Sequence, residues 1–249
     1  MNTTVIIASY KRNKLLKWNL ESLARQDLSN VEVIVLDESY EIDPACLALC
    51  TEYKVNYLHS GKTKKHEYEW RVPGFAFNIG GKKASGEFLV LSCAEVYHPL
   101  DTLDMLRGIL EKNSEAIAIP NKIRDDKGSI IGQLEAGGTA NMASVGRLKV
   151  LDPTLPFFMG MTRSRFIDMG GYDEDFTGVC FDDNDVTDRL ILSGGHYTPI
   201  GAPVVHLFHP RHNYRSEEIK RRWQYNKDLY DKRKGTIVRN EGRDWGLLE

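Results

Sequence analysis

A short acidic run, Asp182-Asp183-Asn184-Asp185, combines residue types that take up protons and bind cations. The residues that follow, 186–190, are typical of the first turns of a helix. One aspartate is enough to cap a helix and complement its dipole. Three within four positions repel one another unless a cation, a basic partner or a proton-transfer reaction uses them. The run therefore indicates a catalytic or cation-binding site, with plain helix capping as the alternative.

The apolar pattern predicts the elements that must position this run. Continuous apolar runs such as 4–8 are typical of strands buried on both faces of a parallel sheet. From Asn13 onward, leucines and Trp18 recur mostly on one side of a helix. The expected strands are 4–8, 31–36, 54–58, 88–91 and 116–119, and further helices are expected at 43–53, 75–84 and 100–112. Repeated βα units predict an α/β fold that binds its ligands outside the carboxyl ends of the strands.

Polar residues lie at several of these strand ends. They are Ser9-Tyr10-Lys11-Arg12, Asp37-Glu38 and Ser92-Cys93-Ala94-Glu95. A carboxylate directly after a buried strand, such as Asp37, is well placed to accept hydrogen bonds from a base or a ribose. The alternative for Asp37 is an aspartate that forms the turn before Ser39.

Composition narrows the class of protein. A chain of 249 residues with 41% hydrophobic residues can bury one substantial core. A net charge of −2 gives no general attraction to nucleic acids or anionic membranes, and no apolar run is long enough to span a bilayer. The first residues enter a strand-like segment at once, so we expect no signal peptide. The cysteines, Cys46, Cys50, Cys93 and Cys180, lack paired CxxC spacing, which indicates free thiols and a reducing, cytoplasmic location.

Further motifs follow one another along the chain. The first half contains 4–12, 33–39, Asn78-Ile79-Gly80 and 84–87, and the second half contains 156–161, Arg165, 170–176 and 182–185. The first set resembles the donor-binding half of family 2 glycosyltransferases, which have the GT-A fold. The second set is similar to the acceptor side of galactosyltransferases and polypeptide N-acetylgalactosaminyltransferases. The resemblance covers roughly residues 3–210 and implies a mixed, mostly parallel sheet flanked by helices.

This resemblance implies an inverting sugar transfer. Such a reaction needs a carboxylate that takes the acceptor's hydroxyl proton and positive charge that holds the departing diphosphate. By the resemblance, Asp183 is the general base and Asp182 the neighbouring acceptor-binding acid. Asp185 would help either of them or cap the helix.

On the donor side, the resemblance makes Asp37 the acid that contacts the nucleoside. Ser9, Tyr10 and Arg12 lie nearby at the end of the first strand, and Asn78 on a later helix is a further donor contact. Lys62, with Lys64 and Lys65, forms a basic loop that could meet phosphate oxygens. A merely solvated lysine loop is the alternative.

The chain departs from the family where a metal is expected. The family places a DxD-type pair after the fourth strand and binds Mn²⁺ or Mg²⁺ through it. This chain has Ser92-Cys93-Ala94-Glu95 instead. Glu95 could supply one carboxylate, assisted by His98, although both could equally be ordinary loop residues. Metal dependence, and to a lesser degree activity, is therefore in question.

Two histidines supply the other expected metal ligands. His206 and His209 follow a strand-like apolar pair, at the point where the family often supplies a histidine ligand. His206 is the first choice, because a continuing strand would turn His209 to the opposite face. A turn at Pro210 could bring His209 round, and a structural histidine is the alternative for either.

Weaker patterns occur in two segments between the halves of the chain and in its C-terminal tail. Asp126-Lys127-Gly128 predicts a hairpin between two strand-like runs, and 135–141 is either a mobile loop over the acceptor site or an ordinary surface loop. Segment 216–234 is helical in pattern and mixes basic and aromatic residues with acids. This mixture favours a packing helix with a solvated face over a nucleic-acid or anionic-acceptor site.

We therefore predict one GT-A glycosyltransferase domain at residues 1–212 and a helical extension at 213–249. Residues 1–99 would bind the nucleotide sugar and residues 100–212 the acceptor. The donor would be a UDP-sugar, and the acceptor a glycan, a lipid-linked group or a protein. The alternatives are a nucleotidyltransferase, although no glycine follows the first strand, and a catalytically silent module that binds nucleotide or sugar.

Overall fold

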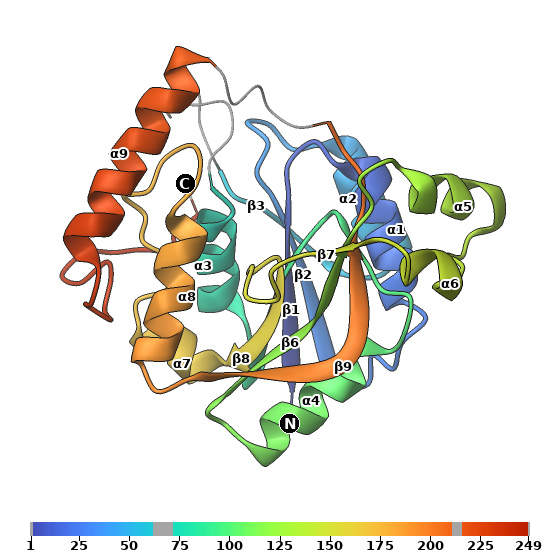
Figure 1. Ribbon diagram of the computed structural model, residues 1–249, viewed down its shortest axis with the longest axis horizontal. Helices are drawn as coiled ribbons and strands as arrows, with labels where there is room; N and C mark the ends of the chain where they lie inside the picture. The colour runs from blue at the N-terminus through green and yellow to red at the C-terminus, as the bar shows by residue number, and fades with distance from the viewer. Residues whose placement is uncertain (1, 62–71, 211–215, 249) are drawn as a thin grey trace.

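Nine strands form one mixed sheet in the computed structural model, which describes residues 2–61, 72–210 and 216–248 (Figure 1). The strand order is β3-β2-β1-β4-β8-β6-β9-β5, and β7 pairs with β6. The strands are β1 (Thr3–Ser9), β2 (Val31–Asp37), β3 (Asn56–His59), β4 (Phe88–Cys93), β5 (Val96–Tyr97), β6 (Ala116–Arg124), β7 (Lys149–Val150), β8 (Phe158–Thr162) and β9 (His196–His206). β1 to β4 are mutually parallel, as are β6 and β9, whereas β8 runs antiparallel between β4 and β6.

Helices cover both faces of this sheet (Figure 1). They are α1 (Asn13–Leu23), α2 (Pro44–Glu52), α3 (Gly74–Lys83), α4 (Thr102–Lys112), α5 (Ser129–Gly137), α6 (Met142–Val145), α7 (Arg163–Asp168), α8 (Asp182–Leu192) and α9 (Glu217–Arg233). Side chains alternate along each strand, so the two faces have separate cores. On β1, Val5 and Ile7 join the core beneath α1, α2 and α4, whereas Ile6 and Ala8 join the core beneath α3, α7 and α8.

The predicted α/β fold with a mixed, mostly parallel sheet is confirmed. Each expected strand and helix of the first 119 residues is present, with ends that differ by a few residues. Continuous apolar runs gave these strands correctly because residues on both faces of the sheet are buried.

The predicted hairpin around Asp126-Lys127-Gly128 is wrong. β6 ends at Arg124, and Ser129 begins α5 instead of a strand. Gly128 adopts a left-handed conformation with φ 73°, and the buried Asp125 carboxylate accepts hydrogen bonds from Ser129 Oγ (3.2 Å) and the backbone N–H of Ile130 (3.1 Å). Asp125 therefore caps the helix from outside it. The expected loop at 135–141 begins within the last turn of this helix.

The C-terminal extension packs against the second half of the sheet domain. α9 lies beside α8 (Figure 1). The fully buried Asn226 of α9 accepts a hydrogen bond from the Thr177 N–H (3.1 Å) and donates to the carbonyls of Thr177 (2.9 Å) and Val179 (2.9 Å). The solvent side of α9 carries pairs such as Lys227–Asp231. α9 is thus a packing helix that fixes the chain leading into α8, while the boundary at 212/213 stays a prediction.

Candidate active site

The carboxyl ends of β1 and β2 bring two predicted donor contacts side by side. Ser9 and Asp37 are partners in the parallel register, and Ser9 is buried. Asp37 Oδ1 accepts a hydrogen bond from the Ser39 N–H (2.9 Å), and Oδ2 accepts from the Asp43 N–H (2.9 Å) and the Tyr57 hydroxyl (2.7 Å). Asp37 therefore forms the turn that the alternative interpretation expected, and it also orders the loop after β2.

Glu95 follows β4 and lies beside Arg12 at the start of α1. Arg12 Nε is 3.2 Å from Glu95 Oε1, and the two side chains are 28% and 15% exposed. His209 Nε2 lies 4.0 Å from the same carboxylate oxygen. The structure thus joins one predicted donor contact, Arg12, to two predicted metal ligands.

Strand pairing brings His206 next to Glu95. β5 begins directly after Glu95, its first residue Val96 pairs with His206, and the Glu95 carbonyl accepts a hydrogen bond from the Leu207 N–H (2.8 Å). The rings of His206 and His209 lie 5.3 Å apart, so the chain does turn and bring His209 round. His206 Nδ1 is 3.1 Å from the Leu207 carbonyl. Because a carbonyl only accepts, Nδ1 carries the proton in that hydrogen bond, which gives Nε2 the lone pair required for metal coordination.

The acidic run begins α8 in an unusual backbone conformation. Cys180 and Phe181, which precede Asp182, both have positive φ, 66° and 69°. Such conformations are costly for residues with side chains and concentrate at functional sites. The Phe181 ring packs against Trp223 (5.3 Å) and Tyr230 (5.7 Å) of α9, which hold it in this position. α9 therefore helps to aim the first turn of α8.

Burial changes the acidity of both leading aspartates. Asp182 is 5% exposed, and its burial, together with the neighbouring Asp183 charge, raises the pKa of Asp182 well above its ordinary value. Burial raises the pKa of Asp183 from 3.8 to about 6, and the nearby Lys122 works in the opposite direction. A carboxylate with a pKa near 6 is a better proton acceptor at neutral pH than an ordinary aspartate.

Asp185 has a structural role instead. It is 2% exposed in a buried ion-pair cluster, with Arg189 Nε at 2.7 Å and Arg239 Nη2 at 2.6 Å. Both carboxylate oxygens are thereby engaged, so Asp185 does not help Asp182 or Asp183 as a base. Asp185 does not cap the helix either, because its two carboxylate oxygens bind Arg189 and Arg239 rather than the backbone N–H groups of the first turn.

The prediction that Asn78 contacts the donor is not supported by its position. Asn78 is fully buried, and its amide donates to the Tyr172 carbonyl (2.9 Å) and Glu174 Oε1 (2.9 Å) and accepts from the Tyr172 N–H (2.7 Å). A Cβ on Gly171, which has φ 62°, would lie 2.3 Å from Asn78 Oδ1. Asn78 therefore fastens the Gly170–Phe176 turn to α3, and the glycine permits this close approach.

One cavity of about 520 Å³ brings the main predicted residues together. Its lining contains Asp183, Glu95, His206 and His209, with Pro73, Phe77, Cys93, Arg124, Leu151, Leu155, Pro156 and Phe157. Ser9, Tyr10 and Asp37 do not line it. Lys62 lies outside the described residues, together with Lys64, Lys65 and His212.

Sequence reasoning missed part of this cavity. Arg124 is the last residue of β6 and lies beyond the segment 116–119 that was predicted as a strand. Phe157 packs edge-on against His206, with ring centroids 5.2 Å apart. The pairing of Arg124 with His206 in neighbouring parallel strands is a long-range contact with no local signal. The suggestion that His98 assists Glu95 is wrong. His98 is buried, its Nδ1 lies 2.8 Å from Thr102 Oγ1, and burial lowers its pKa to about 3.

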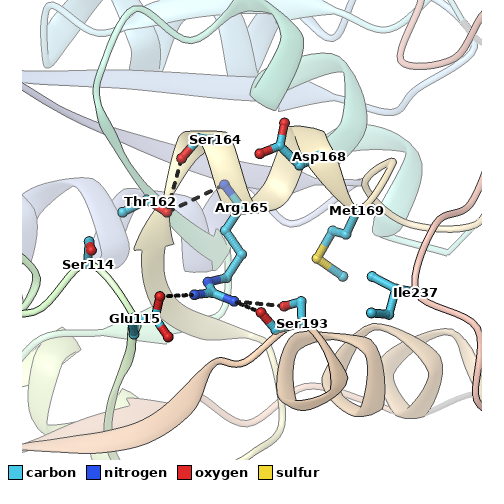
Figure 2. A pocket seen from close by; sticks show the side chains of 9 residues that line it. All are labelled: Ser114, Glu115, Thr162, Ser164, Arg165, Asp168, Met169, Ser193 and Ile237. Atoms are coloured by element: carbon cyan, nitrogen blue, oxygen red, sulfur yellow. Dashed lines mark hydrogen bonds and ion pairs between the residues drawn. The ribbon is translucent and has the colours of Figure 1, made fainter.

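A second cavity, of about 310 Å³, surrounds Arg165 near the start of β9. Figure 2 shows the Arg165 guanidinium reaching toward Glu115 and Ser193. Arg165 Nη1 donates to the Ser193 carbonyl and hydroxyl, both at 2.8 Å, and Nη2 lies 3.8 Å from Glu115. These contacts tie α7 to the turn after α8, and the residues predicted to carry the chemistry lie elsewhere.

The first cavity offers an incomplete set of metal ligands. In the described ranges, no three His, Cys, Asp or Glu side chains are grouped to hold a metal ion. Glu95 and His206 still provide a carboxylate and an imidazole, which suit Mn²⁺, and phosphate oxygens of a nucleotide commonly complete such sites. Arg12 holds Glu95 in an ion pair, so a metal would have to share this carboxylate or displace the guanidinium. The donor set fits a cation that is bound jointly by the protein and a diphosphate.

No helix within residues 2–61, 72–210 and 216–248 has the length and apolar character needed to cross a membrane.

Comparisons with known proteins bear on the family and the fold. The model of glycosyl transferase family 2 matches residues 4–169, and no curated protein sequence matches the chain. The crystal structure of S. aureus TarS 1–349 in complex with UDP matches 84% of this chain and 61% of its own, at 17% identity and TM-score 0.58. That of S. aureus TarS matches 97% of this chain and 45% of its own, at 16% identity and TM-score 0.59. The chain thus spans less than two thirds of these neighbours, and the family match ends just before Gly170.

Proposed function

This chain belongs to glycosyl transferase family 2, and we propose that it is a glycosyltransferase that moves a hexose from a nucleotide sugar, a UDP-sugar, with inversion. The observation that carries the proposal is the cavity that Asp183, Glu95, His206 and His209 line together. The acceptor is a glycan, a lipid-linked group or a protein with a free hydroxyl. The UDP bound to one TarS structure supports the choice of nucleotide.

Asp183 is the general base in this proposal. The acceptor oxygen attacks the anomeric carbon as the bond from that carbon to the diphosphate oxygen breaks, and the hydroxyl proton passes to Asp183. Its pKa of about 6 suits this task, because the carboxylate is ionised at neutral pH and still binds a proton readily. Asp182, deeper and more readily protonated, would hydrogen-bond the acceptor.

Arg12, Glu95 and the two histidines form the diphosphate side. Arg12 would neutralise phosphate oxygens directly, and Glu95 and His206, with His209 beside them, would hold Mn²⁺ or Mg²⁺. When bound, the ion supplies positive charge against the departing UDP. We propose that Ser9, Tyr10 and Asp37 bind the nucleoside, with Asp37 acting through the loop that it orders. Lys62 is a proposed contact to the phosphates.

The family match ends at residue 169, and we propose the acceptor side for the residues that follow on the sequence resemblance to galactosyltransferases and polypeptide N-acetylgalactosaminyltransferases alone. The four cysteines in the structure are free thiols, which supports action in a reducing compartment such as the cytoplasm.

Calorimetric titration of UDP and GDP, first with Mn²⁺ and then with EDTA, tests the donor assignment. We expect UDP to bind in preference to GDP and to bind more weakly in EDTA. Glu95→Ala and His206→Ala should weaken the metal-dependent part. His196→Ala is the matched control, because it removes an exposed histidine from the other end of the same strand. Equal binding with Mn²⁺ and EDTA would overturn the metal site, and failure of both nucleotides to bind would overturn the donor assignment.

Product analysis separates the two remaining alternatives. With a panel of UDP-hexoses, a transferase releases UDP, by transfer or by slow hydrolysis. A nucleotidyltransferase would produce pyrophosphate from a nucleoside triphosphate and a sugar phosphate. A silent binding module would bind UDP and convert none of these substrates.

A further inference from the structure

Of the residues that the structure describes, Arg124 is the only arginine or lysine that lines the 520 Å³ cavity. It is the last residue of β6, and in the parallel register of β6 and β9 it pairs with His206. On its other side, His206 pairs with Val96, the residue directly after Glu95. Strand pairing therefore places Arg124 in one row with His206 and the start of β5, among the groups proposed to bind the diphosphate.

The guanidinium of Arg124 has one exposed partner. Its Nε forms an ion pair with Asp126 Oδ1, and within the described part of the chain the side chain has no other ion pair or hydrogen bond. The two side chains are 25% and 43% exposed, and ion pairs that water reaches contribute little. Arg12, by contrast, is engaged by both Glu95 (3.2 Å) and His209 (3.4 Å). Arg124 is thus the arginine that a ligand can recruit at the smaller cost.

The chemistry of a guanidinium indicates the class of ligand. Its planar, permanently charged fork of N–H groups matches phosphate oxygens, which accept two parallel hydrogen bonds from it. Because Asp126 meets the guanidinium of Arg124 at Nε, the terminal Nη groups can still donate to a ligand in the cavity. A diphosphate that enters beside His206 and Glu95 offers several such oxygens, and it would replace an exposed carboxylate as the partner of Arg124.

We propose that Arg124 is a substrate-binding residue, which releases Asp126 and donates hydrogen bonds to the diphosphate of the donor when the donor enters the cavity. This inference rests on the proposed function, because it takes a nucleoside diphosphate as the ligand. It adds a permanent positive charge from β6 to a site whose other arginine, Arg12, is already paired with Glu95. It also makes Asp126 a competitor of the donor for the same guanidinium.

Binding of ligands with and without phosphate tests the inference. UDP would be titrated by calorimetry with Mn²⁺ and in EDTA, inorganic pyrophosphate in EDTA, and uridine would be followed by ligand-observed NMR. In Arg124→Gln we expect UDP and pyrophosphate to bind at least about tenfold more weakly, because charge-assisted hydrogen bonds are lost, and uridine to bind as before. In Asp126→Asn we expect roughly threefold tighter binding of UDP, because the competing carboxylate is removed. In the Arg124→Gln background, Asp126→Asn should change nothing.

Two results would overturn the inference. One is an unchanged affinity for UDP in Arg124→Gln, and the other is an equal loss for uridine, which would reveal a structural defect instead of a lost phosphate contact. Lys149→Gln is the matched control for loss of positive charge, because Lys149 is exposed and pairs with Arg124 from the neighbouring strand β7. If Arg124→Gln does not fold, Arg124→Lys, which keeps the charge without the planar fork, provides the comparison.

The same titrations separate this inference from the proposed function. Pyrophosphate binding that depends on Arg124, without any binding of UDP, would overturn the proposed nucleotide and support the diphosphate contact. Tight UDP binding that is the same in Arg124→Gln as in the parent protein would overturn the contact and leave the proposed nucleotide in place.

Discussion

The aspartates between 173 and 185 fall into two groups with opposite surroundings. Asp173, Asp175 and Asp185 face arginines: Asp185 pairs with Arg189 and Arg239, and Asp175 with Arg233 (2.5 Å) and Arg243 (2.6 Å). Asp182 and Asp183 have no such ion pair in the described part of the chain, and burial raises the pKa of both. Aspartates thus form structural ion pairs in one group and have raised pKa values in the other.

The difference shows how the molecule separates stability from chemistry over a short stretch. The paired group ties the Gly170–Phe176 turn and α8 to the segment that follows α9, because Arg233, Arg239 and Arg243 all come from the C-terminal part. Of the unpaired group, Asp183 lines the 520 Å³ cavity, and Asp182 is buried beside it. Burial without an ion pair favours the protonated form of both aspartates, whereas the arginine pairs favour the charged form of Asp175.

Asp183→Asn should separate the groups most sharply. We expect turnover to fall about 10³-fold, because the acceptor proton loses its base. The unfolding free energy at pH 7 should stay equal or rise, because a carboxylate whose pKa is raised by burial is replaced by a neutral amide. UDP release and chemical denaturation measure the two quantities, with the exposed Asn184→Ala as the control in the same helical turn. Full activity in Asp183→Asn would contradict the assignment.

Asp185→Asn should have the opposite profile. It leaves Arg189 and Arg239 buried without their shared carboxylate, so we expect a loss of about 3 kcal/mol in unfolding free energy. Turnover per folded molecule should change only a few-fold. A double-mutant cycle with Arg239→Met checks the pairing, because the second substitution should then cost much less than it does alone. Strictly additive losses would show that the pair contributes nothing.

The pH dependence should also differ between the groups. Asp183 has a folded-state pKa of about 6, above its ordinary 3.8, so the catalytic carboxylate is lost below pH 6. We expect kcat/KM to fall about tenfold per pH unit there. For stability the sign reverses: the contribution of this group is full below about pH 4 and is lost as pH rises to 6.

Asp175 provides the contrast in the same titration. Hydrogen bonds from Arg243 and Arg233 outweigh its partial burial and lower its pKa, so its stabilising contribution is present above its ordinary value and is lost on acidification. Comparing the parent protein with Asp183→Asn and Asp175→Asn by denaturation at pH 4 and pH 7 measures both signs. If the unfolding free energy changed equally between pH 4 and pH 7 in all three proteins, the division of the aspartates into two groups would be contradicted.

Arg243→Gln should have the smallest effect. Its side chain is 40% exposed, whereas that of Arg239 is 4% exposed. Ion pairs that water can reach contribute little, so we expect a loss of less than about 1 kcal/mol, which high salt should reduce further. Comparing the thermal unfolding of Arg243→Gln and Arg239→Met tests whether burial determines how much each arginine contributes to the unfolding free energy.

The sequence predicted the fold and the core of the candidate site because both depend on local patterns. Apolar runs identified the parallel strands, and the rule that ligands bind at strand ends led to Glu95. The excess of acid over capping needs pointed to the run 182–185, and the family resemblance selected Asp183 within it and His206. The assignment of chemistry to these residues stays a prediction, as does that of Ser9, Tyr10, Arg12 and Asp37 to the donor.

The failures share a cause, which is contact between residues far apart in the chain. Asn78 sits in a family-like motif, yet its amide is used by Tyr172 and Glu174, 94 and 96 positions away. Lys122 belongs to a strand by its local pattern, and its buried ammonium group donates a hydrogen bond to the carbonyl of Pro153, 31 positions away. The helix at Ser129 begins through a cap from Asp125 and a left-handed Gly128, a combination that also occurs in turns.

The packing of Phe181 against Trp223 and Tyr230 has a practical consequence for anyone who shortens this protein. A truncation that ends before α9 would leave every residue of the family match in place and would look harmless in an alignment. It would nevertheless remove the aromatic clamp that keeps two consecutive left-handed residues in front of Asp182. Minimal fragments for crystallography or inhibitor screening should therefore retain the tail, because it holds the backbone that leads into the candidate site.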